Sequence, residues 1–127
     1  MRREGGSTAV LNGCDLSGSG ENGVLLYRSS SENEGEGASN LKAADTKLTS
    51  RTEGPLFYVT NTKADVILKS SELKYEGNVL AKVSGNNINN WGTPGSNGGN
   101  LTLTAIDQKL KGRIICDEIS TVNLKLK

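Results

Sequence analysis

The feature that most constrains this chain is an internal repeat of apolar residues. Each copy has two apolar residues separated by one position, and a leucine five residues after the second. Three copies keep this spacing, and they are Ala9/Leu11/Leu16, Leu41/Ala43/Leu48 and Val66/Leu68/Leu73. A fourth copy, Leu101/Leu103/Leu110, reaches its leucine with two extra residues, and a fifth begins at Val122. Such self-similarity is the sequence signature of a repeat architecture.

Each copy is followed by a second apolar segment that begins with a glycine. These segments are residues 23–27, 54–58, 77–81 and 112–116. β-Branched residues with a period of two favour strands, and no segment has an apolar stripe of helical spacing and length. Each unit is therefore predicted to be strand, bend, strand, corner, strand. The glycines predict corners with positive φ.

The distance between copies varies, and the excess falls in two segments. From the leading apolar residue the steps are 32, 25, 35 and 21 residues. Residues 29–39 and 84–99 are rich in Gly, Ser and Asn, and we interpret them as loops inserted between coils. The sequence therefore predicts an all-β chain forming one domain over residues 1–127, a parallel β-helix of about four to five coils. The general preference for right-handed crossovers predicts its hand.

A thin solenoid core explains why hydrophobic residues make up only 34% of the chain. Intrinsic disorder, the other interpretation of this composition, predicts no apolar columns. The inward columns are predicted to be Ala9/Leu41/Val66/Leu101/Val122, Leu11/Ala43/Leu68/Leu103/Leu124, Leu16/Leu48/Leu73/Leu110 and Leu25/Leu56/Val79/Ile114. The residues before the repeat leucines, which are Asp15, Lys47, Glu72 and Lys109, alternate in charge and predict an outward ladder.

The cysteines and the C-terminal segment carry two further expectations. Cys14 and Cys116 lie three coils apart, which is too far for a disulfide, so we expect both to be small core residues. Residues 122–127 alternate as a strand with no cap, and an uncapped β-helix exposes its edge. We therefore expect the chain to be a fragment of a longer β-helix, with any signal peptide outside this chain because residues 1–6 contain no apolar segment.

Charge and residue types argue against several function classes. The formal net charge is +1, so we expect no nucleic-acid partner. No apolar run has the length of a membrane span, so we expect no membrane insertion. The chain contains no histidine, which excludes Ser-His-Asp and Cys-His catalytic arrangements.

The segment 86–100 is the most distinctive place for chemistry. It contains the chain's single tryptophan, Trp91, among amide and hydroxyl side chains. Sugar recognition combines a flat apolar ring with hydrogen-bonding groups, so Trp91, Asn90, Asn97 and Asn87 are the candidate carbohydrate-binding residues. The alternative is that Trp91 packs the loop onto the coil beneath it.

Three stretches resemble a known family. They are Asn61-Thr-Lys-Ala-Asp-Val-Ile-Leu-Lys, Trp91-Gly-Thr-Pro-Gly-Ser-Asn-Gly-Gly-Asn-Leu-Thr-Leu-Thr-Ala and Gly112-Arg-Ile-Ile-Cys-Asp-Glu-Ile-Ser-Thr. They are similar to the bacterial carbohydrate-binding β-helix family, which was defined by a cell-surface protein of a cellulolytic anaerobe that binds cellulose and acidic polysaccharides. The resemblance spans most of residues 54–127. It implies a secreted or cell-surface right-handed parallel β-helix that binds a plant cell-wall or acidic polysaccharide.

Calcium binding and catalysis are two further functions to weigh against the sequence. The founding member of the family binds calcium through Asp-rich loops that have no clear counterpart here, but Glu32, Glu34 and Glu36 alternate with Gly or Asn and are weak candidate ligands. A pectate-lyase-like enzyme needs converging carboxylates or a base beside a metal, and no two aspartates fall at equivalent groove positions on neighbouring coils. We therefore expect a non-catalytic polysaccharide-binding module. The first alternative is a structural stalk or adhesin segment. The second is a pectate-lyase-like enzyme that degrades polysaccharide.

Overall fold

The computed structural model describes residues 2–4, 8–18, 23–27, 39–51, 53–86, 95 and 97–127, and in this part of the chain every regular element is a strand. The strands are β1 (Arg2–Glu4), β2 (Thr8–Asn12), β3 (Asp15–Gly18), β4 (Val24–Tyr27), β5 (Ser39–Ala44), β6 (Lys47–Ser50), β7 (Phe57–Thr60), β8 (Lys63–Lys69), β9 (Glu72–Tyr75), β10 (Val79–Val83), β11 (Asn100–Ile106), β12 (Arg113–Cys116) and β13 (Thr121–Leu126). All pairings between them are parallel.

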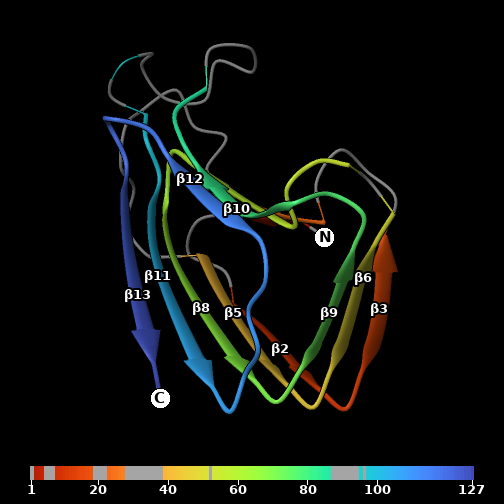
Figure 1. Ribbon diagram of the computed structural model, residues 1–127. Helices are drawn as coiled ribbons and strands as arrows, with labels where there is room; N and C mark the ends of the chain where they lie inside the picture. Colours follow the sequence, from red (N-terminus) through yellow and green to blue (C-terminus); the bar gives the residue numbers. More distant parts are fainter. Residues whose placement is uncertain are drawn as a thin grey trace.

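The strands form three sheets, one on each side of a three-sided cross-section (Figure 1). Sheet A has the order β1-β4-β7-β10-β12, sheet B has β13-β11-β8-β5-β2, and sheet C has β3-β6-β9. Strands succeed one another in the cycle A, B, C through β10, so each of the first three circuits adds one strand to each sheet, and then β11 of sheet B is followed directly by β12 of sheet A. We number the circuits by their sheet B strands: coil 1 (8–27), coil 2 (39–60), coil 3 (63–83) and coil 4 (100–116).

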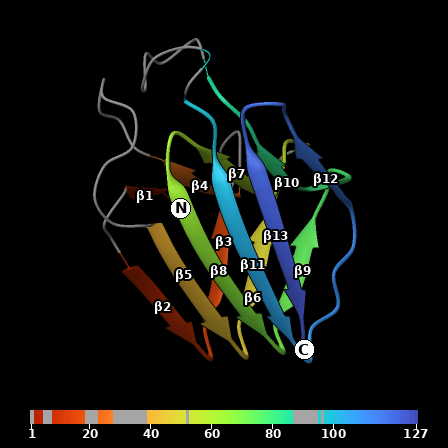
Figure 2. The same ribbon diagram turned by 90° about the vertical axis from the view of Figure 1, so that its left-hand side faces the viewer.

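The solenoid is right-handed. In Figure 1 the chain runs down sheet B, up sheet C and back across sheet A, which is counter-clockwise. Figure 2 shows the molecule from the left side of Figure 1, so the face that was nearest to the viewer of Figure 1 is now on the right. Within sheet B, β13 lies on that near side and β2 lies on the far side. The chain therefore advances toward that viewer as it turns counter-clockwise, which defines a right-handed helix. The predicted parallel β-helix and its hand are confirmed.

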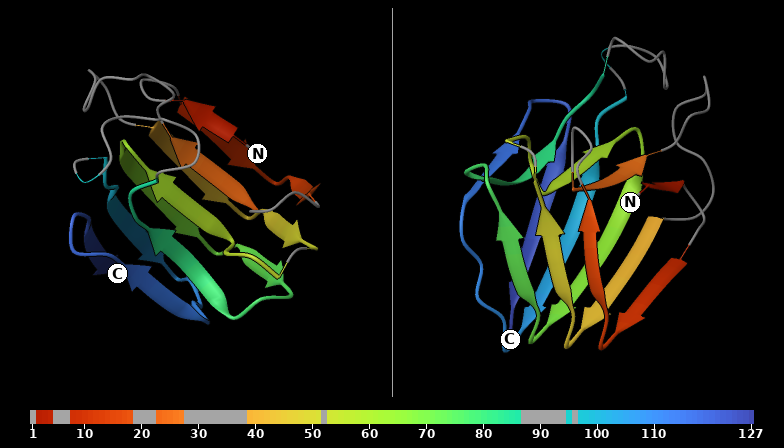
Figure 3. Two further views of the ribbon diagram at one scale, coloured as in Figure 1. Left: turned by 90° about the horizontal axis from the view of Figure 1, so that it is seen from above. Right: turned by 90° about the vertical axis from the view of Figure 1, so that its right-hand side faces the viewer.

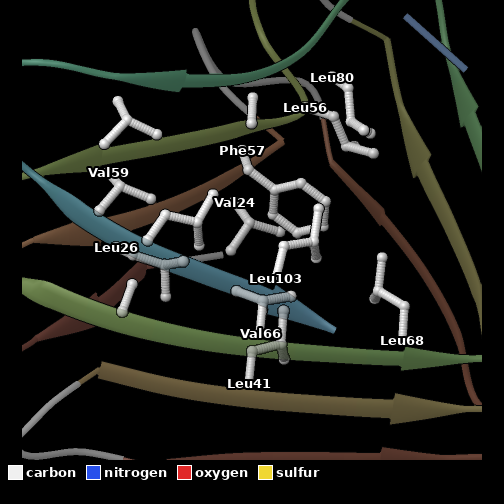
Figure 4. Packing of buried hydrophobic residues seen from close by; sticks show 14 of the residues in the cluster. Val24, Leu26, Leu41, Leu56, Phe57, Val59, Val66, Leu68, Leu80 and Leu103 are labelled. Carbon is white, nitrogen blue, oxygen red and sulfur yellow. The ribbon is translucent and has the colours of Figure 1, made fainter. Parts of the chain in front are cut away.

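The core is a narrow column of stacked aliphatic side chains around one aromatic ring (Figure 4). Leu41, Val66 and Leu103 come from successive sheet B strands and each is at most 1% exposed. Phe57 fills the centre from sheet A and is also 1% exposed. Because each coil adds only a few such side chains to one continuous core, the low hydrophobic content suffices for a folded chain.

The predicted inward columns of sheet B are correct through coil 3 and wrong at coil 4. Ala9, Leu41 and Val66 are in register, but Val66 pairs with Leu103, and Leu101 pairs with Ala64. β8 begins three residues before Val66 and β11 begins three residues before Leu103, so the residue of coil 4 equivalent to Val66 is Leu103, two residues later than the apolar repeat indicates. A shift of two residues keeps every side chain on its own face, so the apolar pattern alone does not detect it. With this register the two extra residues before Leu110 disappear.

The predicted sheet A column is also wrong. Leu25 pairs with Tyr58, whereas the inward columns are Val24/Phe57/Ala81/Ile114 and Leu26/Val59/Val83/Cys116. Val24, Leu25 and Leu26 are all buried. A run of consecutive apolar residues has no alternation from which the inward face can be read, so the sequence left this register undetermined.

The bend between sheets B and C is the most regular feature of the solenoid. Positive φ angles occur one residue before the polar bend position in every coil, at Gly13, Asp45, Ser70 and Asp107. The next residue accepts a hydrogen bond from the coil before it. Thr46 Oγ1 accepts from Cys14 N–H at 3.3 Å, and Ser71 Oγ accepts from Thr46 N–H at 3.3 Å. Both hydroxyls donate to the carbonyl two residues upstream. The bends therefore form a polar ladder along the stack.

The predicted corner glycines have two different structural reasons. Gly112 has the expected positive φ of 109°. Gly77 does not, and a Cβ there would lie 2.4 Å from the Glu53 carbonyl oxygen. The prediction of positive φ is therefore wrong for Gly77, as it is for Gly23 and Gly54. At Gly77 the close approach of two backbones excludes any side chain.

Two remaining sequence predictions have different outcomes. The charge ladder is confirmed for three of its four members, because Asp15 pairs with Lys47 and Lys47 pairs with Glu72, but it is wrong for Lys109, which lies in no strand. The expectation that the cysteines are core residues is wrong, because both are exposed and both thiols are free. Cys14 occupies the bend position that Thr46 and Ser71 fill in later coils. Cys116 belongs to an inward column, but β12 is the last strand of sheet A among the described residues, so no further strand there covers it.

Candidate functional site

The corner between sheet A and sheet B carries both of the long insertions. Residues 28–38 follow β4 and precede β5, and residues 84–99 connect β10 with β11. Both pairs of strands belong to the same two sheets, so the two insertions leave the solenoid at the same corner, from coils 1 and 3. Their roots lie two strand spacings apart, which is about 9.6 Å. In Figure 1 this corner lies at the upper left.

Coil 2 lies between the two insertions and turns this corner with only two residues. Asn61 has a positive φ of 51° and Thr62 follows it, and both are buried. Asn61 N–H donates to the Asn97 carbonyl at 3.0 Å, which joins coil 2 to the end of the longer insertion. The hydroxyls of Ser39 and Thr62 lie 3.3 Å apart, which joins coil 2 to the end of the shorter one. The short corner is thus a common support for both insertions.

The ends of the longer insertion are fastened by buried hydrogen bonds. Asn97 is 1% exposed, and its side-chain amide donates to the Asn86 carbonyl at 2.5 Å, which closes the base of the loop. Asn86 in turn donates through its side chain to Thr60 Oγ1 at 2.9 Å. On the other side, Gly85 N–H donates to Asp117 Oδ2 at 2.9 Å. The base of the loop is therefore rigidly held by three coils.

Close backbone contacts fix the returning end of the same loop. A Cβ on Gly99 would lie 2.5 Å from the Val59 carbonyl oxygen. Gly99 N–H donates to Ser120 Oγ at 3.0 Å, and the Gly99 carbonyl accepts from Thr121 N–H. The sequence run Gly98-Gly99-Asn100 is therefore a packing requirement and the direct entry into β11.

One aromatic side chain that the sequence analysis did not select lies beside this base. Tyr58 projects from the outer face of sheet A and is half-buried, and its hydroxyl donates to the Gly85 carbonyl at 3.4 Å. Lys82 Nζ lies 5.6 Å from the centroid of the Tyr58 ring, within cation–π distance. Alternation along β7 indicates an outward Tyr58, but only the register brings it to the loop and to Lys82.

The structure describes one of the seven predicted site residues. Asn97 is buried, and its amide holds the loop closed, so as placed it offers no surface to a ligand. Trp91, Asn90 and Asn87 lie outside the described residues, and so do Glu32, Glu34 and Glu36. Within the described part of the chain, no group of three or more His, Cys, Asp or Glu residues is arranged to hold a metal ion.

The described corner presents hydrogen-bonding groups around one aromatic ring. Its ionisable groups are Lys82 and Asp117, and Asp117 already accepts from Gly85 through Oδ2. Such a surface suits a neutral or anionic polar ligand that contacts amide groups and a ring face.

Comparisons with protein-family models, with curated proteins and with solved structures give no match. In the ranges that the structure describes, no helix is long and apolar enough to cross a membrane. The family resemblance described above therefore stays a prediction.

Proposed function

We propose that this chain is a non-catalytic polysaccharide-binding module of a secreted or cell-surface bacterial protein, with a plant cell-wall or acidic glycan as its ligand. The observation that carries the proposal is the shared corner. The tryptophan-containing insertion and the glutamate-containing insertion leave the solenoid at one edge, on either side of the short corner at Asn61. A rigid scaffold that collects variable loops at one edge is a common way to build a binding surface.

The arrangement also supports a particular division of roles. Asn97, Gly99 and Asp117 hold the base of the loop, whereas Trp91, Asn90 and Asn87 are the proposed sugar contacts. Tyr58 and Lys82 extend that surface onto sheet A, where a lysine beside an aromatic ring favours an acidic sugar. Calcium held by Glu32, Glu34 and Glu36 is a separate proposal for the neighbouring loop.

The proposal is tested by binding to insoluble cellulose and to a panel of acidic polysaccharides. Trp91→Ala is expected to weaken binding at least about tenfold, with the melting temperature unchanged, because an aromatic contact concentrates binding energy. Asn90→Ala and Asn87→Ala are expected to weaken it less. Asn78→Ala is the matched control, because Asn78 is exposed at a different corner of the solenoid.

Two results would replace the proposal with one of its alternatives. If the wild type binds no glycan and Trp91→Ala lowers the melting temperature, Trp91 packs the loop and the chain is a stalk or adhesin segment. If polygalacturonate yields unsaturated or reducing-end products, the chain is an enzyme. Calorimetric titration with calcium tests the glutamate loop: a triple Glu→Gln variant at 32, 34 and 36 is expected to remove any heat, with Glu76→Gln as control.

A further inference from the structure

Sheet C lacks a strand in coil 4, and the reason is the length of the chain there. We measure the interval from the polar bend position to the residue of the same coil that lies in the Phe57 column of sheet A. This interval is ten, eleven and ten residues in coils 1, 2 and 3. These intervals are Cys14 to Val24, Thr46 to Phe57 and Ser71 to Ala81. In coil 4 the corresponding interval, from Gln108 to Ile114, is only six residues. Six residues are too few to follow β9 and then turn the corner into sheet A.

The short connector of residues 107–112 is instead fastened at its two ends. The Gln108 side-chain amide accepts from Ser71 N–H at 2.8 Å and donates to the Ser71 carbonyl at 2.7 Å, so it takes the hydrogen bonds that a neighbouring strand would make. At the other end, the Tyr75 hydroxyl donates to the Lys111 carbonyl. Burial raises the pKa of Tyr75 above its ordinary value of 10.0, so the phenol keeps the proton that it donates.

Between these two fastenings β9 has an open edge. In the described sheet order β9 pairs with β6 alone. Glu72 N–H donates to the Thr46 carbonyl in coil 2. Because hydrogen-bonding directions alternate along a strand, Leu73 and Tyr75 present their backbone groups to the open edge. Figure 3 (right) shows the connector as a bare trace beside β9.

A groove of about 470 Å³ runs along this edge. Leu73 and Tyr75 line its apolar part, and Lys109 and Lys111 of the connector line its far side, with Asp107 at one end. The volume lies within the range of ligand sites in proteins. A groove bordered by a free strand edge suits an extended peptide, which is bound by main-chain hydrogen bonds and by alternate side chains.

The stacked columns of sheet C specify the side chains that fit. The outward column Asp15, Lys47, Glu72 alternates in charge, so a basic residue suits the next position. The inward column Leu16, Leu48, Leu73 is apolar, and Leu110 of the connector packs against the same core without joining a strand, so an apolar residue suits this edge. The next outward residue of β9 is the exposed Lys74, which calls for an acidic partner. We infer that the open edge of β9 binds, by parallel β-augmentation, an extended peptide of another protein with the pattern basic–apolar–acidic.

The test is the binding of labelled peptides followed by fluorescence anisotropy. A peptide with Lys-Leu-Glu at its centre is expected to bind the wild type about threefold to tenfold more tightly than one with Lys-Leu-Lys, because Lys74 repels the second lysine. In Lys74→Glu this preference is expected to reverse. Lys42→Glu, the same change of charge at an exposed position of β5 in sheet B, is the matched control and is expected to leave the preference unchanged, because Lys42 does not lie beside β9. Equal binding of both peptides to every variant would overturn the inference.

A second variant tests the missing strand directly. Inserting Tyr-Glu-Gly-Asn, copied from coil 3, between Lys111 and Gly112 gives coil 4 the ten-residue interval of its neighbours. The chain then has enough length to pair its own strand with β9, and peptide binding is expected to fall at least about tenfold while the circular dichroism spectrum stays that of a β-solenoid. Unchanged peptide binding by this folded variant would contradict the inference.

Amide hydrogen exchange distinguishes the site from other surfaces without any variant. The Leu73 and Tyr75 amides are expected to exchange fast in the free protein and to be protected by the Lys-Leu-Glu peptide. If the peptide protects β13 instead, the inference is wrong. Sedimentation that shows self-association of the wild type, lost on the four-residue insertion, would assign the edge to a second copy of this chain and overturn the peptide assignment.

Discussion

Two corners of the same solenoid follow opposite rules. In all four coils the bend at the end of the sheet B strand begins with a residue of positive φ, and in coils 2 to 4 the next residue is polar and bonds to the coil before it. The corner from sheet A to sheet B takes two residues in coil 2 and carries long insertions after coils 1 and 3. One chain thus contains an invariant corner and a permissive one.

The difference shows where the register of the stack is fixed. At the bend, each side chain is bonded both to its own strand end and to the neighbouring coil, as Thr46 is to Ala44 and Cys14. At the permissive corner, the bonds join only the roots of the insertions, as between Asn61 and Asn97. Extra residues there leave the strands on either side in place, so that corner is free to carry function.

The largest expected effect comes from inserting one glycine at each corner. Between Asp45 and Thr46 the insertion shifts β6 by one residue and turns its core face outward, so we expect a loss of several kcal/mol, enough to unfold a domain of ordinary stability. The same insertion between Gly35 and Glu36 is expected to cost less than about 1 kcal/mol, because closure entropy grows slowly with loop length. Urea denaturation measures both. Equal losses would remove the distinction between the corners.

The next effect compares one glycine from each corner. Gly99→Ala is expected to lower the free energy of unfolding by about 2–3 kcal/mol, because its Cβ would lie 2.5 Å from the Val59 carbonyl oxygen. Gly13→Ala meets no atom within 4 Å and carries only the strain of a φ of 65°, about 1 kcal/mol. Thermal and urea unfolding of both variants decide the order. A smaller loss for Gly99→Ala than for Gly13→Ala would contradict the packing at the permissive corner.

A third effect tests the polar ladder. Thr46→Val keeps the shape of the side chain and removes both the acceptor for Cys14 N–H and the donor to the Ala44 carbonyl, so we expect a loss of about 1–2 kcal/mol. Thr49→Val is the control, since Thr49 lies on β6, the strand that follows this bend, and is half-buried on the outer face of sheet C. We expect the control to change stability by less than about 0.5 kcal/mol. Similar losses for both would show that the ladder adds nothing.

The smallest effect concerns positive φ itself. Ser70 has a φ of 48°, which strains a non-glycine residue by about 1 kcal/mol. Ser70→Gly relieves this strain but gives the unfolded chain more freedom, so we expect a net change within about 0.5 kcal/mol. Ser70→Val is expected to lose more than about 1 kcal/mol, because a β-branched residue tolerates this conformation poorly. Equal stability of the two variants would show that residue 70 does not have a left-handed backbone conformation.

The sequence was a better guide to the fold than to the candidate site. The repeat predicted the strands, the bends, the parallel stacking and the charge column of Asp15, Lys47 and Glu72, because inward and outward positions alternate with a strict period. It misplaced Leu101 by two residues because a shift of two preserves both faces. It misplaced Leu25 because three consecutive apolar residues have no alternation.

The candidate site depended on contacts that the sequence does not show. Asn97 lies in the segment that the sequence predicts to bind sugar, yet its side-chain amide is buried and closes the base of the loop. Tyr58 was not selected, because its neighbours along the chain do not indicate that it faces Gly85 and Lys82 from the next coil.

By itself the sequence determined the architecture. Its apolar residues repeat with a fixed spacing, and each copy is followed by a second apolar segment that begins with glycine. Few folds other than a solenoid can bury this pattern with so little hydrophobic surface. Only the tertiary structure decided the exact register, the support of both insertions by one corner, and the open edge of β9. Each of these depends on hydrogen bonds between coils. Such bonds join residues far apart in the chain, as those of Gln108 to Ser71 do, and no local pattern encodes them.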